Sequence, residues 1–200
     1  METINGTGLI PLPENPGKRS DISHAVVFGV LGVAQLPTED FDVAVPLKIK
    51  NQSDLDFCTG FASTAITEDQ EGEEMDPLFQ FAAIKKQTND WRSWGADLRS
   101  AGMALVNFGS LPQRLAPYRI GEQKRDFLAN WENYSQNLWD SAKGFKKQTM
   151  LFVDGPHTLF WNIVMTLWQN RAEKRTVLLG VIWRKYWNNA QGGVIPELTQ

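Results

Sequence analysis

Residues 51–63 constrain this 200-residue chain most, because they place its single cysteine at the start of a predicted buried helix. Gln52 lies six residues before that cysteine, Cys58. The N–H groups and the dipole at a helix N-terminus favour a thiolate over a thiol. A glutamine just upstream can direct its side-chain N–H toward an oxyanion, beside the N–H of the cysteine itself. The segment therefore predicts Cys58 as a nucleophile and Gln52 as an oxyanion donor.

The same segment resembles the active-site segment of the papain family of cysteine peptidases. That family has a glutamine, five further residues, the cysteine, an aromatic residue or Thr, a small residue, Phe, and then Ser or Ala. The positions that match this pattern are Gln52, Cys58, Thr59, Gly60, Phe61 and Ala62. The resemblance implies that Cys58 is the catalytic nucleophile and that Gln52 contributes to the oxyanion hole.

Further segments resemble the family, its bacterial-type members in particular, in the same order along most of the chain. Residues 8–13 with Asp21 are similar to the lead-in of those members, although Ser20 stands where they have Arg. The other matching segments are 45–52, 76–81, 95–118 and 177–196. The resemblance implies an α+β papain-like cysteine peptidase fold, with a helical lobe and an incomplete β-sheet lobe.

The order of expected elements, with helices first and strands later, is also typical of an α+β fold. The expected helices follow Cys58 and cover 78–86, 96–108 and 158–169. The first of them is expected to bury an apolar set at helical spacing, made of Phe61, Ala62, Ala65 and Ile66. The expected strands cover 25–35, 42–49, 149–153 and 177–183.

The remaining segments complete the expected organisation of the chain. The acidic residues 68–76 are expected to form a loop. Residues 119–144 are expected to be a polar insertion with helix around Phe127, Trp131 and Leu138. Residues 1–36 are expected to form an extended N-terminal arm, and 37–200 a papain-like domain. Within that domain, 37–118 is the helical lobe with Cys58, and 119–200 is the remainder with part of the sheet lobe.

A papain-type reaction also needs a histidine to pair with the thiolate and protonate the leaving amine, and an Asn or similar residue to orient the ring. Family spacing places that histidine about 130–150 residues after the cysteine, at about 188–208 here. No histidine lies at 188–200, so the catalytic His and Asn are expected beyond residue 200. His157 is interpreted as a turn or capping residue, with catalysis the lesser alternative, and His24 as a surface or packing residue.

The segment departs from the family pattern before the cysteine, where Asp56 and Ser53 replace glycines. Asp56, with Asp54 nearby, is expected to raise the pKa of a neighbouring thiol. Alternatively, both aspartates point to solvent and serve as turn or helix N-cap residues. Cys58 itself is equally a candidate for a buried structural thiol, which is a common role of single cysteines.

Two classes of function follow. The first is a papain-like cysteine endopeptidase that acts on a peptide or protein substrate. The second is a catalytically inactive papain-fold structural or binding protein, for instance a component of a virion or another large assembly, with other protein subunits as partners. A small-molecule hydrolase or transferase that uses Cys58 has no supporting feature in the sequence.

Composition restricts the class of protein, the partners and the location that are expected for this chain. With 42% hydrophobic and 22% charged residues, the chain is expected to fold into a globular domain, and its eight tryptophans are expected to pack in the core. The net charge of −3 gives no basic surface for nucleic acid, and no membrane partner, cofactor or metal is expected. The single cysteine and the lack of a signal peptide or transmembrane segment predict a cytoplasmic or virion-associated protein.

Overall fold

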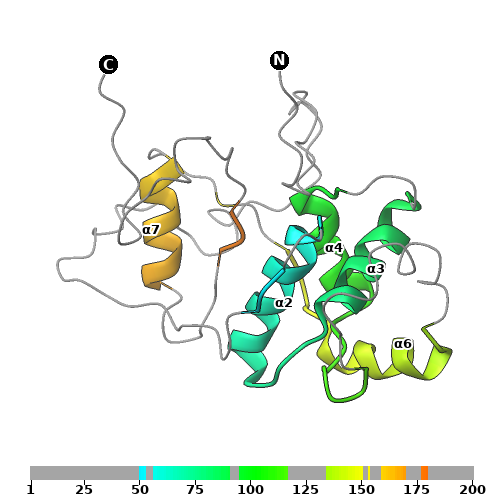
Figure 1. The fold of residues 1–200 in the computed structure, drawn as a ribbon. Coiled ribbons are helices and arrows are strands. Elements are labelled where there is room, and N and C mark those ends of the chain that lie inside the picture. The colour runs from blue at the N-terminus through cyan, green and yellow to red at the C-terminus, as the bar shows by residue number, and fades with distance from the viewer. Residues whose placement is uncertain are drawn as a thin grey trace.

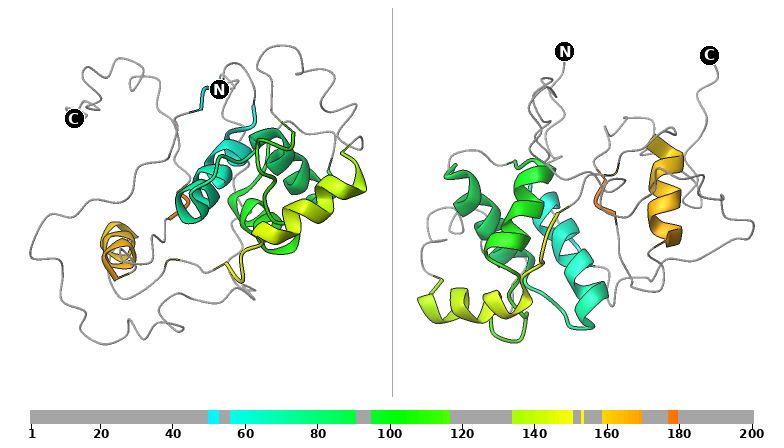
Figure 2. Two further views of the ribbon diagram at one scale, coloured as in Figure 1. Left: turned by 90° about the horizontal axis from the view of Figure 1, so that it is seen from below. Right: turned by 180° about the vertical axis from the view of Figure 1, so that it is seen from behind.

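The computed structural model describes residues 50–52, 56–90, 95–116, 134–150, 153, 159–169 and 177–179. These residues contain five α-helices and one 3₁₀ turn, which are α2 (Cys58–Glu71), α3 (Pro77–Thr88), α4 (Leu98–Asn107), α6 (Gln136–Ala142), η3 (Lys143–Phe145) and α7 (Leu159–Gln169). Figures 1 and 2 show α2, α3, α4 and α6 as one group, with α7 standing apart from it. The expected helices over 78–86, 96–108 and 158–169 are confirmed.

The starts of α3 and α4 follow from capping residues in the sequence. The Asp76 carboxylate accepts hydrogen bonds from the N–H groups of Leu78 at 2.8 Å and Phe79 at 3.0 Å, and Pro77 occupies the first helical turn. Asp97 caps α4 in the same way, through the N–H of Ser100 at 2.8 Å. Such caps satisfy N–H groups that have no partner within the helix, and so they set where each helix begins.

The buried face of α2 differs from the expected one. Ala62 is exposed and Phe61 is only half-buried, so the predicted apolar set does not form the buried face. The buried residues are small or polar, and they are Thr59, Gly60, Ser63, Thr64, Thr67, Glu68 and Asp69. The reason is close packing against α3, since a Cβ added at Gly60 would lie 2.7 Å from the carbonyl oxygen of Pro77.

The expected acidic loop at 68–76 is also partly wrong, because α2 continues to Glu71 and buries Glu68 and Asp69. The helix ends at Gly72, whose φ of 71° is a conformation that glycine adopts readily. Met75 then forms an isolated antiparallel bridge with Pro112, after α4. These contacts bring the segment that follows α4 against the loop between α2 and α3.

Aromatic side chains fill the core between α3, α4 and α6. The Trp139 ring lies 4.5 Å from the Phe79 ring and 5.8 Å from the Phe108 ring, measured between centroids. Trp139 is 7% exposed, which confirms the predicted packing role for this tryptophan. The Lys86 ammonium lies 4.1 Å from the centroid of the Trp139 ring and thereby ties α3 to α6.

All regular secondary structure of the described residues is helical apart from isolated bridges, and none of these residues lies in a strand. Residues 149, 150, 153 and 177–179, within two of the expected strands, have no regular secondary structure. The arm 1–36, the strands expected at 25–35 and 42–49, and the Phe127 and Trp131 region of the insertion lie outside the described residues. In the described part of the chain, no helix is both long enough and apolar enough to cross a bilayer.

Candidate active site

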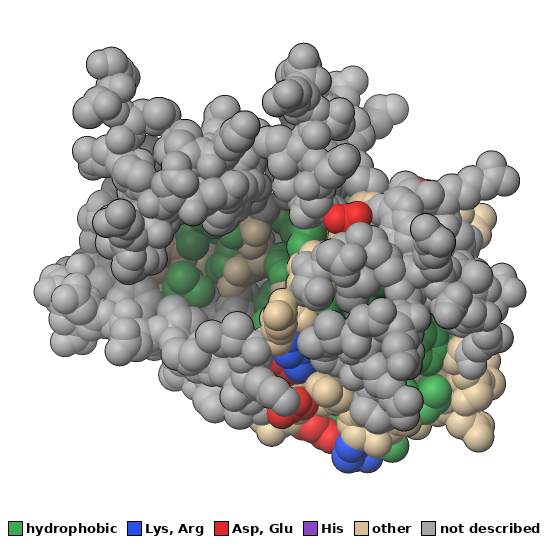
Figure 3. All heavy atoms as spheres, in the orientation of Figure 1, with side chains coloured by type: hydrophobic (Ala, Val, Ile, Leu, Met, Phe, Trp, Pro, Cys, Tyr) green, Lys and Arg blue, Asp and Glu red, His purple; other side chains and the backbone are tan. Residues whose placement is uncertain are grey.

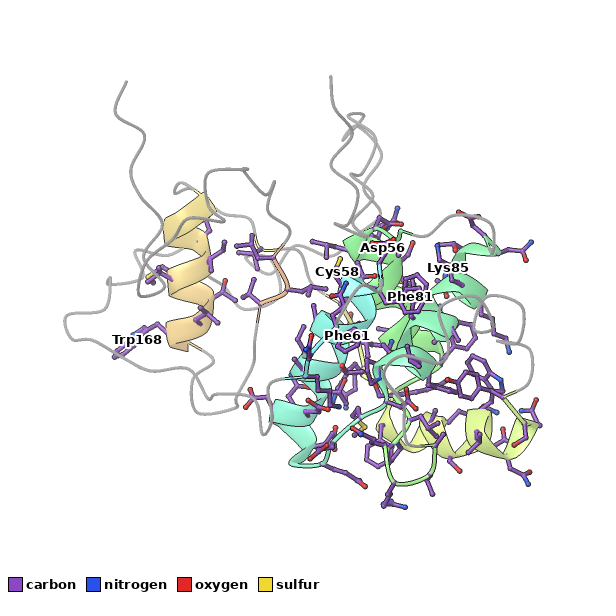
Figure 4. The ribbon with its side chains drawn as sticks, in the orientation of Figure 1. Asp56, Cys58, Phe61, Phe81, Lys85 and Trp168 are labelled. Carbon is purple, nitrogen blue, oxygen red and sulfur yellow. The ribbon has the colours of Figure 1, made fainter. Side chains whose placement is uncertain are left out.

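Cys58 is the first residue of α2 and is half-exposed. The residue before it, Phe57, is the N-cap, and its side chain forms no capping hydrogen bond. Figure 4 shows Cys58 and Asp56 at the same end of α2, with Phe81 and Lys85 on the neighbouring helix α3. The prediction that Cys58 begins a helix is therefore confirmed, whereas the alternative that Asp56 is the N-cap is wrong.

The surroundings of Cys58 raise the pKa of its thiol above the ordinary value. Burial is the largest cause, because it disfavours the charged thiolate, and the Asp56 carboxylate raises the pKa further. The backbone N–H groups of Thr59 and Cys58 act in the opposite direction, as expected at a helix N-terminus. The predicted direction of the Asp56 effect is confirmed, and burial of the thiol raises its pKa more than Asp56 does. Asp54 lies outside the described residues.

A stack of side chains supports the residue that precedes the thiol. The rings of Phe57 and Phe81 are fully buried and stacked, with centroids 4.0 Å apart and an interplanar angle of 22°. The Lys85 ammonium lies 5.1 Å from the centroid of the Phe81 ring and donates to the carbonyl oxygen of Gly95. Burial lowers the pKa of Lys85. The stack holds the Phe57 ring, and so it restrains the backbone on which Cys58 begins the helix.

The carbonyl oxygen of Phe57 is held as well. It accepts hydrogen bonds from the N–H groups of Gly60 at 2.9 Å and Phe61 at 3.1 Å, which are the first bonds of the helix. The ring and the carbonyl of the same residue therefore both have defined partners. Because the N–H of Cys58 follows this carbonyl in the same peptide plane, its direction is defined too.

Gln52 lies in the segment 50–52, and its side chain is half-buried. Residues 53–55, which connect it to the helix, lie outside the described residues. A role for Gln52 in an oxyanion hole beside Cys58 therefore stays a prediction. His24 and His157 also lie outside the described residues.

A buried ion pair anchors the segment that carries Gln52. The Lys50 ammonium donates to the Glu68 carboxylate and to the carbonyl oxygen of Met75, and the Met75 N–H donates to the same carboxylate at 2.7 Å. The Lys50 and Glu68 side chains are 6% and 1% exposed. This pair was not predicted from the sequence. Glu68 extends the helical spacing of Gly60 and Thr64, and this spacing was the available signal that it faces inward.

Charged side chains that are paired at the surface lie at the other end of α2. Lys147 contacts the Glu71 carboxylate at 2.6 Å, and Arg114 contacts that of Glu73 at 2.6 Å. Figure 3 shows red and blue side chains gathered along the lower edge of the molecule. In the part of the chain that the structure describes, no group of His, Cys, Asp and Glu side chains could hold a metal ion.

No model of a known protein family matches the sequence, and no curated protein matches it. Among solved structures, the chain is similar to xylellain, a cysteine protease from Xylella fastidiosa, with a TM-score of 0.55 and 18% sequence identity. The similarity covers 82% of this chain and 63% of xylellain, so the chain spans less than two thirds of that protein. At this identity the similarity concerns the fold, and it supports the papain-like fold predicted from the sequence.

Proposed function

We propose that this chain is a papain-like cysteine endopeptidase domain, with Cys58 as the nucleophile. The observation that carries the proposal is a half-exposed thiol on the first residue of α2, in a fold similar to that of a cysteine protease. The N–H groups of Thr59 and Cys58 lower the pKa of this thiol, which is the effect that a thiolate nucleophile needs. The papain-like fold further implies a β-sheet lobe that faces the helical lobe across a cleft.

In the proposed reaction, the base takes the proton of the Cys58 thiol, the sulfur attacks the carbonyl carbon of a peptide bond, and the carbonyl electron pair moves onto the oxygen. The N–H of Cys58 and the side-chain amide of Gln52 donate hydrogen bonds to this oxyanion. When the oxyanion collapses, the C–N bond breaks, and the amine leaves with a proton from the base. Water then hydrolyses the thioester and restores the thiol. The reaction requires no cofactor.

The base is a histidine, which we assign to a segment outside residues 1–200. Family spacing of about 130–150 residues after the cysteine supports this assignment. The raised pKa of Cys58 makes such a partner necessary, because burial and Asp56 leave the thiol protonated when no imidazole is beside it. We propose that the Asn that orients the imidazole also lies in this segment.

The test uses the natural full-length protein and an epoxysuccinyl peptide probe that alkylates peptidase cysteines. We expect rapid labelling of Cys58, complete loss in Cys58→Ala, and cleavage of an unfolded protein substrate. Gln52→Ala should lower kcat about 100- to 1,000-fold with little change in KM, since an oxyanion donor acts in the transition state. Failure to label or cleave in the full-length protein, with its mass determined, would refute the proposal.

The alternative is a catalytically inactive papain-fold protein that serves as a structural or binding component, for instance of a virion. The observation that favours it is the net rise in the pKa of Cys58, to which Asp56 contributes. An inactive protein should tolerate Cys58→Ser with no change in its assembly state or partner binding. Co-sedimentation of both forms with the natural assembly distinguishes this function from the first.

A further inference from the structure

Asp56 places a carboxylate beside the candidate nucleophile. It lies two residues before Cys58, at the same end of α2, and it is half-buried (Figure 4). Within the described residues, Asp56 makes no hydrogen bond or ion pair, whereas the described lysine–carboxylate and arginine–carboxylate pairs lie elsewhere. A carboxylate that is partly removed from water and has no cation beside it gains more from an arriving positive charge than a fully hydrated one does.

The backbone keeps Asp56 near the thiol. Phe57 separates the two residues, and both its ring and its carbonyl oxygen are held, by Phe81 and by the first turn of α2. Three consecutive residues span no more than about 7 Å between their outer Cα atoms. The Asp56 charge also reaches the sulfur, since it is one of the causes that raise the pKa of Cys58.

We propose that Asp56 makes the Cys58 site selective for a positive charge, which in a peptide substrate is a lysine or arginine side chain beside the attacked carbonyl. A carbonyl carbon that bonds to the Cys58 sulfur brings its flanking side chains to the end of α2 at which Asp56 lies. A cationic side chain there is attracted, and an acidic one is repelled. The substrate preference rests on the proposed peptidase function, whereas the selection of charge at the thiol does not.

The single cysteine allows a direct test, because every thiol modification reports on Cys58. Two methanethiosulfonate reagents of similar size, one with a trimethylammonium group and one with a sulfonate, are compared by their rates of reaction with the folded protein. Dividing each rate by that for a small model thiol removes intrinsic reactivity. We expect the cationic reagent to have the higher normalised rate. The ratio of the two normalised rates, cationic to anionic, should fall about tenfold in Asp56→Asn. Asp56→Lys should reverse it.

Glu71→Gln is the matched control. It removes a carboxylate from the same helix, about 20 Å from Cys58 at 1.5 Å per residue, which exceeds the Debye length of about 8 Å at physiological salt. The ratio should stay unchanged in this variant. Salt at about 1 M, where the Debye length is about 3 Å, should shrink the wild-type ratio toward that of Asp56→Asn. Circular dichroism checks that each variant is folded.

The second arm measures cleavage of peptides with lysine, or with the uncharged methionine, beside the scissile bond. We expect kcat/KM to favour lysine about tenfold in the wild type and little in Asp56→Asn. A reagent ratio that is equal in wild type and Asp56→Asn, or a Cys58 that neither reagent reaches, would overturn the charge selection. A ratio that falls as expected, in a full-length protein that cleaves no peptide, supports the charge selection and overturns the peptidase function alone.

Discussion

Replacing Lys50 by Met is the perturbation whose effect can be derived most directly from this structure. The Glu68 carboxylate is 1% exposed, and its partners are the Lys50 ammonium and the N–H of Met75. Without the ammonium, a buried negative charge keeps one hydrogen bond, and the carbonyl oxygen of Met75 loses its donor. Breaking a buried pair in this way costs about 3–5 kcal/mol. We expect the free energy of unfolding to fall by that amount.

Urea unfolding of a double-mutant cycle measures this effect. Lys50→Met and Glu68→Gln should each be strongly destabilising, and the double variant should be far more stable than the sum of the two predicts, because no unpaired charge remains. Arg114→Met is the control. Its ion pair with Glu73 is largely exposed, so its loss should cost less than about 1 kcal/mol.

Two results would refute this reasoning. One is a Lys50→Met variant as stable as the Arg114 control, which would mean that the pair is not buried in solution. The other is strict additivity of the two single changes. The same substitution should also affect the candidate active site, because Lys50 lies two residues before Gln52. If Gln52 acts in catalysis, Lys50→Met should lower kcat while the protein is still folded.

Two further predictions concern packing and pH. Gly60→Ala should cost about 1–3 kcal/mol in urea unfolding, because the new methyl group would lie 2.7 Å from the carbonyl oxygen of Pro77. Gly144→Ala, where no atom lies within 4 Å of the new group, should be nearly neutral, and equal effects would contradict the close packing of α2 on α3. Burial raises the pKa of Asp76 from 3.8 to about 6, so the folded state binds this proton more tightly than the unfolded state. Its contribution to stability is therefore present below about pH 4 and is lost as pH rises to about 6, at a cost of roughly 3 kcal/mol. Asp76→Asn should remove this part of the pH dependence of unfolding, and an unchanged pH profile would show that Asp76 is not its source.

The starts of the helices were predictable because capping acts over a few residues. Asp76 precedes Pro77 and caps α3, and Asp97 caps α4 without help from any distant residue. The position of Cys58 at the start of α2 was predicted from its local segment, although no side chain caps that helix. The caps of α3 and α4 depend on hydrogen bonds between residues two or three apart, which the sequence displays directly.

The buried face of α2 was not predictable from hydrophobicity. Its apolar side chains at Phe61 and Ala62 lie half-buried and exposed, whereas Gly60 packs against α3. A small residue becomes the centre of a contact when another helix approaches closely, and only the tertiary structure shows whether one does. The same holds for the tryptophans, of which Trp139 was predicted to be buried without its partners being known.

The sequence by itself determined the helix that Cys58 begins, the caps of α3 and α4, and the resemblance that indicated a papain-like fold. Only the tertiary structure decided what surrounds the thiol. Lys50 forms an ion pair with Glu68, which is 18 residues away in sequence, and the Phe57 ring stacks on that of Phe81, which is 24 residues away. Burial, which contributes most to the pKa of Cys58, also depends on such distant contacts. Hydrogen bonds near a helix end act locally, but desolvation and charge pairing depend on which distant segments the fold brings together.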